Sequence, residues 1–592
     1  MWLLLQLSEA STASAVTFSL NGSTVAVDDH GASLLDVLRE QLGCRSVKDG
    51  CSPQGQCGCC TVWVDGAPRV ACVTAVRRVA GRSVTTVEGL DPALRARWAA
   101  AFVGTGASQC GFCTPGILLR LAALGQGNRP PSRHAVESAL LAHLCRCTGW
   151  QSIVEAACIA LGIPGPEPAA LLASPEPAAS PAPAAPDQSP PTERLLAAWR
   201  AQLEGRSPQG SGPDIVLGGG GFADDRAPEG ALVQLGAAET PPAPSLAAAR
   251  AAVTKVQGRN TTLPPTYPVD LPPGEWARTL QTTWVEPAYV EPDASWCVPG
   301  DLPASPLANG GAFGGKRRSP VPSRAAALAR ELGRPVRVLW SREDVVRYGA
   351  KRPPLALGLR ADGTGVVRMG RTAGSPDLGR LRDRIREIAP GVAVEEVAIA
   401  GPLVSDELRG AGWVEVLAAL NALPTRRPPM PEGSQEEGSQ EGHSQEGHGR
   451  AEVSRPGAGR AIVTVDTQGG ALGRGTVTAE LWAGEPLHGV TLRSYVLGAV
   501  HQALGLVWTE GIAVDDDGAP VDLTIRSFGI LAARDMPEVE VVLHESDRWP
   551  VNGSDAVFAA TVAAAWMAEG FAPRWPTRRG AGRGGQGRGT IG

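Results

Sequence analysis

Eight of the twelve cysteines fall into two groups of four within the first 150 residues, and this pattern constrains the fold more than any other feature. Thiolates are soft, strongly donating ligands, and four of them together suit an iron-sulfur cluster or zinc far better than a hard cation. The sequence therefore predicts a redox protein. The expected metal ligands are Cys51, Cys57, Cys60 and Cys72 in the first group and Cys110, Cys113, Cys145 and Cys147 in the second.

The first group begins in a tight, glycine-rich loop at residues 49–60. Plant-type ferredoxins hold their cluster in such a loop, where glycines allow close wrapping and aim backbone N–H groups at the sulfides. Hairpins and a capped helix are predicted around it, at 16–20 and 24–27, at 61–64 and 69–73, and from Ser33 to Leu42. These elements together predict a β-grasp, ferredoxin-like unit.

Zinc and a disulfide framework are the alternatives for this loop. Disulfides are disfavoured because the apolar run at 2–7 is short and has no basic residue before it, so it is no convincing secretion signal. Zinc sites normally show two well-separated cysteine pairs, whereas three ligands here lie within ten residues. Cys59 and Cys60 are adjacent, and only one of them can take the third place.

The cysteines of the second group precede two helices. The segment Gln109-Cys-Gly-Phe-Cys-Thr-Pro-Gly116 leads into an apolar stretch at 117–124, and Cys145-Arg-Cys-Thr-Gly149 leads into another at 152–161. Further helices at 92–102 and 132–144 complete a predicted four-helix bundle, whose cluster lies at helix N-termini where the dipoles favour an anionic centre. A Cys-x-Cys pair is unusual for a zinc finger, so an iron-sulfur cluster is again the prediction.

These segments resemble the molybdenum hydroxylases, the family that includes xanthine dehydrogenases and aldehyde oxidases. The family signature Cys-Gly-Phe-Cys-Thr-Pro-Gly followed by Cys-Arg-Cys-Thr-Gly is present letter for letter, and the resemblance covers about residues 15–162. It implies two [2Fe-2S] clusters, with Cys60 rather than Cys59 as a ligand of the first. It also implies that Gln109 and Cys147 lie against the pterin of a molybdenum cofactor.

A glycine-rich segment, Gly310-Gly-Ala-Phe-Gly-Gly-Lys316, fits the first places of a phosphate-binding P-loop, but Arg317 stands where Ser or Thr should bind magnesium. We therefore predict a turn before a helix at 323–332 and a strand at 336–340. The segment resembles the molybdopterin-contacting part of the family's large domain. That resemblance implies cofactor contacts by Gly311, Phe313 and Gly314.

The chain also departs from the family pattern. Five residues rather than four separate Cys51 from Cys57. The stretches at 219–225, 282–292, 492–510 and 535–543 resemble the large domain in the right order, yet that region is much shorter than in the family. The Gly-Val-Gly-Glu turn that carries the family's catalytic glutamate has no clear match, so the catalytic residue is unknown. Asp555 offers a carboxylate, but its interpretation as the N-cap of the following helix is stronger.

The length of the chain predicts several domains, and two low-complexity tracts mark boundaries between them. With 592 residues, 43% of them hydrophobic, it can bury several cores, whereas the Pro/Ala-rich and Gln/Gly-rich tracts cannot build one. The expected fold class is multidomain α+β, with an incomplete α/β molybdopterin-binding region. The predicted boundaries are 15–90 for the ferredoxin-like domain, 91–162 for the helical bundle, 163–213 for a linker, 214–430 and 453–572 for the molybdopterin-binding region, 431–452 for a disordered repeat and 573–592 for a disordered basic tail.

The predicted function is that of a xanthine dehydrogenase-like hydroxylase, which oxidises a purine, a related heterocycle or an aldehyde and passes electrons through both clusters. No FAD domain is expected in the chain, so the acceptor would be a flavin-containing subunit or another external partner, within a homo- or hetero-oligomer. The alternative is an electron-transfer component without hydroxylase activity. A net charge of −5 implies neither nucleic acid nor a membrane as partner, and the spare cysteines are typical of a reduced, cytoplasmic protein.

Overall fold

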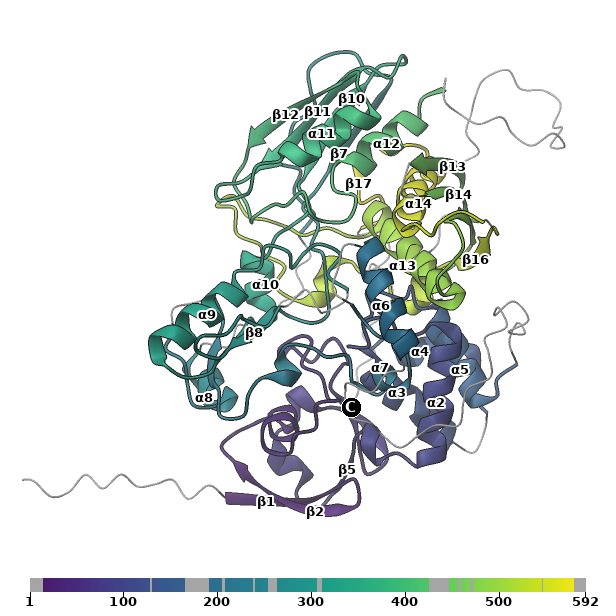
Figure 1. Ribbon diagram of the computed structural model, residues 1–592. Coiled ribbons are helices and arrows are strands. Elements are labelled where there is room, and N and C mark those ends of the chain that lie inside the picture. The colour runs from purple at the N-terminus through teal and green to yellow at the C-terminus, as the bar shows by residue number, and fades with distance from the viewer. Residues whose placement is uncertain are drawn as a thin grey trace, which may run out of the picture.

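The structure is a computed structural model that describes residues 14–127, 130–164, 191–204, 208–237, 240–253, 263–305, 311–424, 447–455, 459–468, 472–545 and 547–579. The predicted multidomain α+β architecture is confirmed. In Figure 1 the ferredoxin-like unit and the helical bundle lie at one end of the molecule, and the sheet that contains β10, β11 and β12 lies at the other. No helix in the described ranges is long and apolar enough to cross a membrane.

The N-terminal unit is a five-stranded sheet in the order β2-β1-β5-β3-β4. Its strands are β1 (Ser14–Leu20), β2 (Ser23–Asp29), β3 (Thr61–Val64), β4 (Ala67–Val70) and β5 (Ser83–Thr85). The predicted β1–β2 hairpin is confirmed, and Asn21 and Gly22 both adopt the positive φ that its tight turn requires. The central strand β5 was not predicted. The second hairpin ends before its expected limit, because Ala71–Val73 forms a 3-10 turn that carries Cys72.

The helix predicted to run to Leu42 is present but irregular. It begins as α1 (Leu34–Asp36), capped by Ser33, and continues as a π-helical turn over Val37–Gln41. Its buried face packs into the core that also surrounds the first cysteine group.

Four helices form the bundle: α2 (Pro92–Thr105), α3 (Thr114–Ala122), α4 (Arg133–Leu140) and α5 (Gln151–Leu161). The predicted helices are confirmed, but α4 is shorter than the expected 132–144. Ser132 is its N-cap, and the chain leaves the helix after Leu140 so that Cys145 can approach Cys113.

The predicted linker at 163–213 contains a helix, α6 (Pro191–Glu204), so the prediction of a semi-stiff tether over this whole stretch was wrong. Ala197, Arg200 and Ala201 are buried, and their spacing gives the helix one narrow face of small side chains with a single arginine. Residues 165–190, which include most of the Pro/Ala-rich tract, lie outside the described part of the chain.

Three sheets build the remainder of the molecule. The smallest has the order β6-β9-β8, the second β12-β11-β10-β7-β17 and the third β13-β14-β15-β16. The strands are β6 (Leu232–Leu235), β7 (Arg278–Thr282), β8 (Ala294–Cys297), β9 (Val336–Leu339), β10 (Leu355–Leu359), β11 (Gly365–Arg371), β12 (Val392–Ala398), β13 (His448–Arg455), β14 (Gly459–Asp466), β15 (Thr476–Trp482), β16 (Glu538–Leu543) and β17 (Arg574–Trp575).

Helices accompany each sheet, and the two longest pack on each other. The helices are α7 (Pro213–Val216), α8 (Leu246–Ala252), α9 (Val321–Leu332), α10 (Arg342–Tyr348), α11 (Gly379–Ile388), α12 (Trp413–Asn421), α13 (Gly489–Trp508) and α14 (Ser554–Ala568). The α13–α14 pair belongs to a core that continues into the second and third sheets. The predicted helix and strand after the glycine-rich segment are confirmed as α9 and β9.

Two predicted disordered stretches are partly ordered. The strand β13 begins at His448, inside the expected repeat 431–452, because it pairs along its length with β14. The strand β17 begins just inside the expected tail, pairs with β7, and buries Trp575 against Trp566 at a ring-centroid distance of 5.6 Å. Residues 425–446 and 580–592 lie outside the described ranges.

Candidate functional site: paired cysteines beside a glycine-rich loop

The second cysteine group is assembled at the ends of two loops. The Sγ atoms of Cys110 and Cys147 are 3.6 Å apart, and the thiols of Cys113 and Cys145 are in hydrogen-bond contact. All four side chains are buried. The hydrogen bond from Cys113 lowers the pKa of Cys145 to about 6, which favours the thiolate, the form that binds metals.

The arrangement in pairs bears on the choice between zinc and a cluster. A structural zinc needs four ligands around one point, whereas a [2Fe-2S] cluster spreads four cysteines over two irons. Two neighbouring thiol pairs therefore fit the cluster better than zinc.

The first cysteine group forms a continuous chain of thiol contacts. Cys51 contacts both Cys57 and Cys72, and Cys72 also contacts Cys60. Backbone N–H groups point at the sulfurs, because Gln54 N lies 3.2 Å from the Cys51 Sγ and Cys72 N lies 3.4 Å from the Cys60 Sγ. Such N–H groups are the contacts that stabilise cluster-bound thiolates.

Cys59 is the fifth buried cysteine of this region. Its thiol contacts Cys57 and its burial raises its pKa, whereas Cys60 contacts Cys72. The geometry therefore supports Cys60 as the cluster ligand, and that assignment remains a proposal.

The two cysteine groups meet at His143. Leu144 N donates to the carbonyl of Cys57 at 3.0 Å, and the His143 ring lies 3.3 Å from the Thr61 hydroxyl. The ring also covers Gly58, where any Cβ would collide with it. Burial lowers the pKa of His143 to about 3, so the folded protein holds this imidazole neutral.

Acid is therefore expected to loosen this junction. His143 is neutral when folded but gains a proton below its ordinary pKa of 6.5 when unfolded, so stability is lost as the pH falls from 6.5 towards 3. The loss should be about 1.4 kcal/mol per pH unit, measured as the free energy of unfolding in denaturant. His501, whose pKa burial lowers to about 4, adds a similar slope.

His143→Gln should reduce this acid slope by about 1.4 kcal/mol per pH unit, which is the contribution of one histidine. The matched control is His134→Gln, because His134 is exposed on α4. An unchanged slope in the His143→Gln variant would contradict this role.

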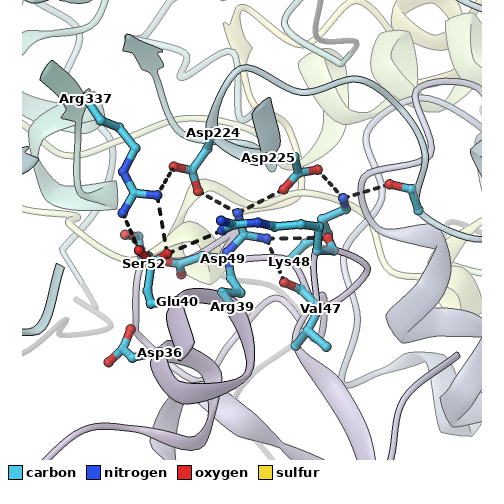
Figure 2. A network of polar contacts seen from close by, with 12 residues as sticks. Asp36, Arg39, Glu40, Val47, Lys48, Asp49, Ser52, Asp224, Asp225 and Arg337 are labelled. Atoms are coloured by element: carbon cyan, nitrogen blue, oxygen red, sulfur yellow. Dashed lines mark hydrogen bonds and ion pairs between the residues drawn. The ribbon is translucent and has the colours of Figure 1, made fainter. Parts of the chain in front are cut away.

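A buried ion network joins the ferredoxin-like unit to the first part of the proposed molybdopterin-binding region, residues 214–430 (Figure 2). Arg39 donates to Asp224 at 2.7 Å and to Asp225 at 2.9 Å, and Lys48 also pairs with Asp225. Arg337, from β9, pairs with Asp224 at 3.2 Å. The arginines lower the pKa of Asp224 to about 2 despite its burial.

A second set of ion pairs adjoins the first cysteine loop. Arg250, from α8, bridges the carboxylates of Asp36 and Asp49. Asp49 also accepts a hydrogen bond from Ser52 at 3.2 Å. The loop that carries Cys51 is thus fixed from outside its own unit.

The glycine-rich segment lies directly against the second cysteine group. A Cβ on Gly311 would be 3.3 Å from the Cys147 Sγ, so the backbone approaches the thiol as closely as glycine permits. Gly314, at a φ of +95°, packs against the carbonyl of Glu407. Gly310 lies outside the described residues.

The P-loop interpretation fails in three dimensions as it did in sequence. The Lys316 ammonium is buried and paired with Glu291 at 2.7 Å, so it is not presented to a phosphate. Burial raises the pKa of Glu291 to about 8, although Lys316 opposes the shift.

A cavity of about 40 Å³ opens beside Phe313. Three arginines line it, and each is held by an acidic partner: Arg146 pairs with Glu510 at 2.7 Å, Arg352 with Glu415 at 2.7 Å, and Arg409 with Asp555 at 2.9 Å. Glu286 also lines the cavity and pairs with Lys351 at 2.8 Å. The cavity is therefore a charged recess, with one wall formed by the glycine-rich loop.

Asp555 does not cap the helix that follows, so that interpretation was wrong. The N-cap of α14 is Gly553, which makes no side-chain hydrogen bond. The Asp555 carboxylate binds Arg409 instead, because the first turn of α14 faces the 409–412 loop. Asp555 does not line the cavity itself, but it binds Arg409, which does.

Gln109 lies where the bundle meets α13. Its amide nitrogen donates to the Cys147 carbonyl at 2.9 Å and to the Ser494 hydroxyl at 3.0 Å. Gly149 and Gly498 allow α13 to approach the loop that carries Cys147, since a Cβ at either position would collide with the backbone of the other segment. The structure thus brings Gln109, Cys147 and the glycine-rich loop together.

Arg146, Arg409 and Glu510 are site residues that the sequence analysis missed. Arg146 stands between two predicted ligands, and this position was the only available signal for it. Arg409 and Glu510 are far from the cysteines in sequence, and only folding places them at the cavity.

Comparison with known proteins adds three domain matches. Residues 86–158 match a [2Fe-2S] binding domain. Residues 305–366 and 377–537 match two molybdopterin cofactor-binding domains. The first match contains the second cysteine group, and the other two contain the glycine-rich loop and the Arg409 loop.

Curated relatives match about a quarter of the chain. The chain is 42% identical over 139 residues to the nicotine 6-hydroxylase small subunit of Paenarthrobacter nicotinovorans, which covers 24% of this chain and 83% of that protein. It is 46% identical over 132 residues to the aldehyde oxidoreductase of Megalodesulfovibrio gigas, or 22% of this chain and 14% of that one. The xanthine dehydrogenase of Emericella nidulans is 42% identical over 171 residues, which are 26% of this chain and 12% of the enzyme. These sequence matches thus span only a small part of the larger relatives.

The fold as a whole is similar to that of solved aldehyde oxidoreductases. The structure from Desulfovibrio gigas has a TM-score of 0.61 at 16% identity, over 95% of this chain and 98% of that chain. The one from Desulfovibrio desulfuricans has a TM-score of 0.63 at 16% identity, over 93% and 97%. With the small-subunit match and the three domains, these findings show that the chain belongs to the molybdenum hydroxylase family of xanthine dehydrogenase and aldehyde oxidoreductase-type proteins.

Proposed function

We propose that this chain is a molybdenum hydroxylase that oxidises a purine, a related N-heterocycle or an aldehyde and sends the electrons through two [2Fe-2S] clusters. The observation that carries the proposal is the approach of Gly311 to the Cys147 Sγ, with an ideal Cβ at 3.3 Å. It puts the proposed cofactor loop in contact with a proposed cluster ligand. Electron transfer between centres needs such short separations through packed protein.

The residues present fit both kinds of cofactor. The two groups of four buried cysteines supply eight soft ligands for iron. The glycine-rich loop, together with Gln109, offers the close backbone approach that a pterin needs. When bound, the molybdenum cofactor would supply a two-electron oxidation of a C–H bond with the product oxygen coming from water. Gly311, Phe313 and Gly314 would hold it, and Arg409 would orient a polar substrate at the cavity.

The contacts support one order of the proposed centres. The second cysteine group touches the glycine-rich loop, and the first group lies beyond it across the His143 junction. Electrons would therefore reach the group of Cys147 first and that of Cys51 second. An FAD-containing subunit or another external acceptor would take them from there. Relatives named as subunits, such as the nicotine 6-hydroxylase small subunit, support a hetero-oligomer.

A second function, electron transfer without hydroxylation, is favoured by one observation. The carboxylates at or beside the cavity are ion-paired: Glu510 with Arg146, Glu286 with Lys351, and Asp555 with Arg409. Each of these carboxylates is thus already bound to a cation of the chain, and the family's glutamate turn has no clear match in the sequence. Under this function the large region would dock the clusters onto a partner.

Metal content separates the two functions. Protein purified anaerobically with any co-purifying subunits should contain about four iron atoms and one molybdenum per chain, and should reduce a dye with hypoxanthine or an aldehyde. Full iron with no molybdenum and no turnover would assign the electron-transfer function. Colourless, iron-free protein after reconstitution would contradict both.

A further inference from the structure

A cavity of about 600 Å³ is lined in part by residues that follow Phe313 in the chain, and Phe313 itself does not line it. It is bounded by Gly315 and Ser319, the start of α9, the end of α10 and the loops at 374–376 and 403–404. Cavities of 300–1,000 Å³ are the size that small-molecule ligands occupy. None of the proposed cluster or cofactor contacts lines it.

One wall of this cavity is aromatic. Trp340 is buried at 5% exposure, and Tyr348 stands at its edge with 48% of its surface exposed. Their ring centroids are 6.2 Å apart and the planes are tilted by 58°. Because the planes are tilted, a planar molecule can stack on one of these rings and meet the other edge-on.

The lining of the cavity also has a basic part. Arg318 and Arg324 both line the cavity, and the Arg324 Nε donates to Gln234 at 3.0 Å, which fixes the orientation of its guanidinium. Arg318 pairs with Glu407 at 3.2 Å. The acidic side chain at the wall is Asp293, which accepts a hydrogen bond from Tyr289 at 2.5 Å.

Backbone and hydroxyl groups add to this basic side. The twelve-residue helix α9 begins here, and no side chain caps its first turn. Pro320 and Pro322 have no N–H, so the groups that this helix start offers are the N–H groups of Val321 and Ser323. The Ser319 hydroxyl oxygen next to it is buried and has no hydrogen-bond partner. Uncapped N–H groups at a helix start, together with guanidinium groups, attract phosphate or carboxylate.

We propose that this cavity binds a planar aromatic molecule that carries an anionic group, with its ring on Trp340 and Tyr348 and its phosphate or carboxylate between Arg324 and the start of α9. The site is separate from the proposed hydroxylase cavity, and its ligand requires neither molybdenum nor iron. Its volume of about 600 Å³ is large enough for ligands from a substituted single ring to a mononucleotide.

The test is direct binding by isothermal titration calorimetry to the purified full chain. AMP serves as the phosphate probe and benzoate as the carboxylate probe. One saturable site per chain is expected for at least one of them. Binding by AMP alone would identify a phosphate ligand, and binding by benzoate alone a carboxylate ligand.

Arg324→Ala should weaken this binding about tenfold, the usual effect of losing one charged hydrogen bond. Arg330→Ala is the matched control, because Arg330 lies on the exposed face of the same helix. Tyr348→Leu, at the half-exposed edge, should also weaken binding and provides a second variant should Arg324→Ala fold poorly. Absence of saturable binding by both probes, or binding that the cavity variants leave unchanged, would overturn the proposal. Neither result depends on metal content, so it is distinguishable from a failure of the proposed hydroxylase function.

Discussion

Replacing Cys147 by Ser is expected to abolish one of two spectroscopically distinct [2Fe-2S] signals and leave the other. Cys147 is a member of the second cysteine group, and its Sγ is 3.6 Å from that of Cys110. A serine oxygen is a harder and weaker ligand for iron than a thiolate, so the cluster should be lost or severely altered. Electron paramagnetic resonance of dithionite-reduced protein, with iron counted per chain, measures the outcome.

The bundle should also lose stability, because the cluster links two of its loops. The matched control is Cys158→Ser, since Cys158 is a buried cysteine of α5 outside both groups. It should keep both signals. Retention of both signals at full strength in the Cys147→Ser protein would refute the ligand assignment, whereas loss in the Cys158→Ser protein would point to general unfolding.

Replacing Asp225 by Ala should lower the free energy of unfolding by about 3–5 kcal/mol, the usual result of removing one partner from a buried ion pair. Asp225 joins Lys48 and Arg39, and the Lys48 side chain is fully buried. Without the carboxylate, two cations of the ferredoxin-like unit would remain buried against the region that follows it (Figure 2). Denaturant unfolding followed by tryptophan fluorescence and by cluster absorbance would measure the loss.

In this variant the two signals should also report different unfolding midpoints. Cluster absorbance should be lost at a lower denaturant concentration than tryptophan fluorescence changes, because the network fixes the unit that carries Cys51. An exposed pair on α11 provides the control: Asp383 lies 3.6 Å from Arg386, with side chains 77% and 63% exposed. Asp383→Ala should change stability by less than about 1 kcal/mol. Equal effects of the two substitutions would show that the buried network is not what holds the unit in place.

Local sequence determined the elements whose signals lie within a few residues. The Asn21-Gly22 turn forced the first hairpin, Ser33 and Ser132 capped their helices, and the spacing of the cysteine motifs placed the thiols on the loops that meet. These features depend on φ preferences, side-chain capping and ligand spacing, which are all short-range. The family and its two kinds of cofactor domain were accessible for the same reason.

Only the tertiary structure decided the features that depend on distant partners. Asp555 was expected to cap a helix but binds Arg409, and β17 was assigned to a disordered tail but pairs with β7. The helix α6, which lies inside the predicted linker, packs against the rest of the protein through the buried side chains of Ala197, Arg200 and Ala201. In each case the stabilising contact comes from a residue or strand far along the chain.

The site itself follows the same division. Sequence alone named the cysteines and the glycine-rich loop, because each motif is continuous in the chain. It could not show that Gly311 touches Cys147, or that Glu510 neutralises Arg146. Charge pairing and close approach depend on distance in space, and distance between segments hundreds of residues apart is set by packing rather than by any local preference.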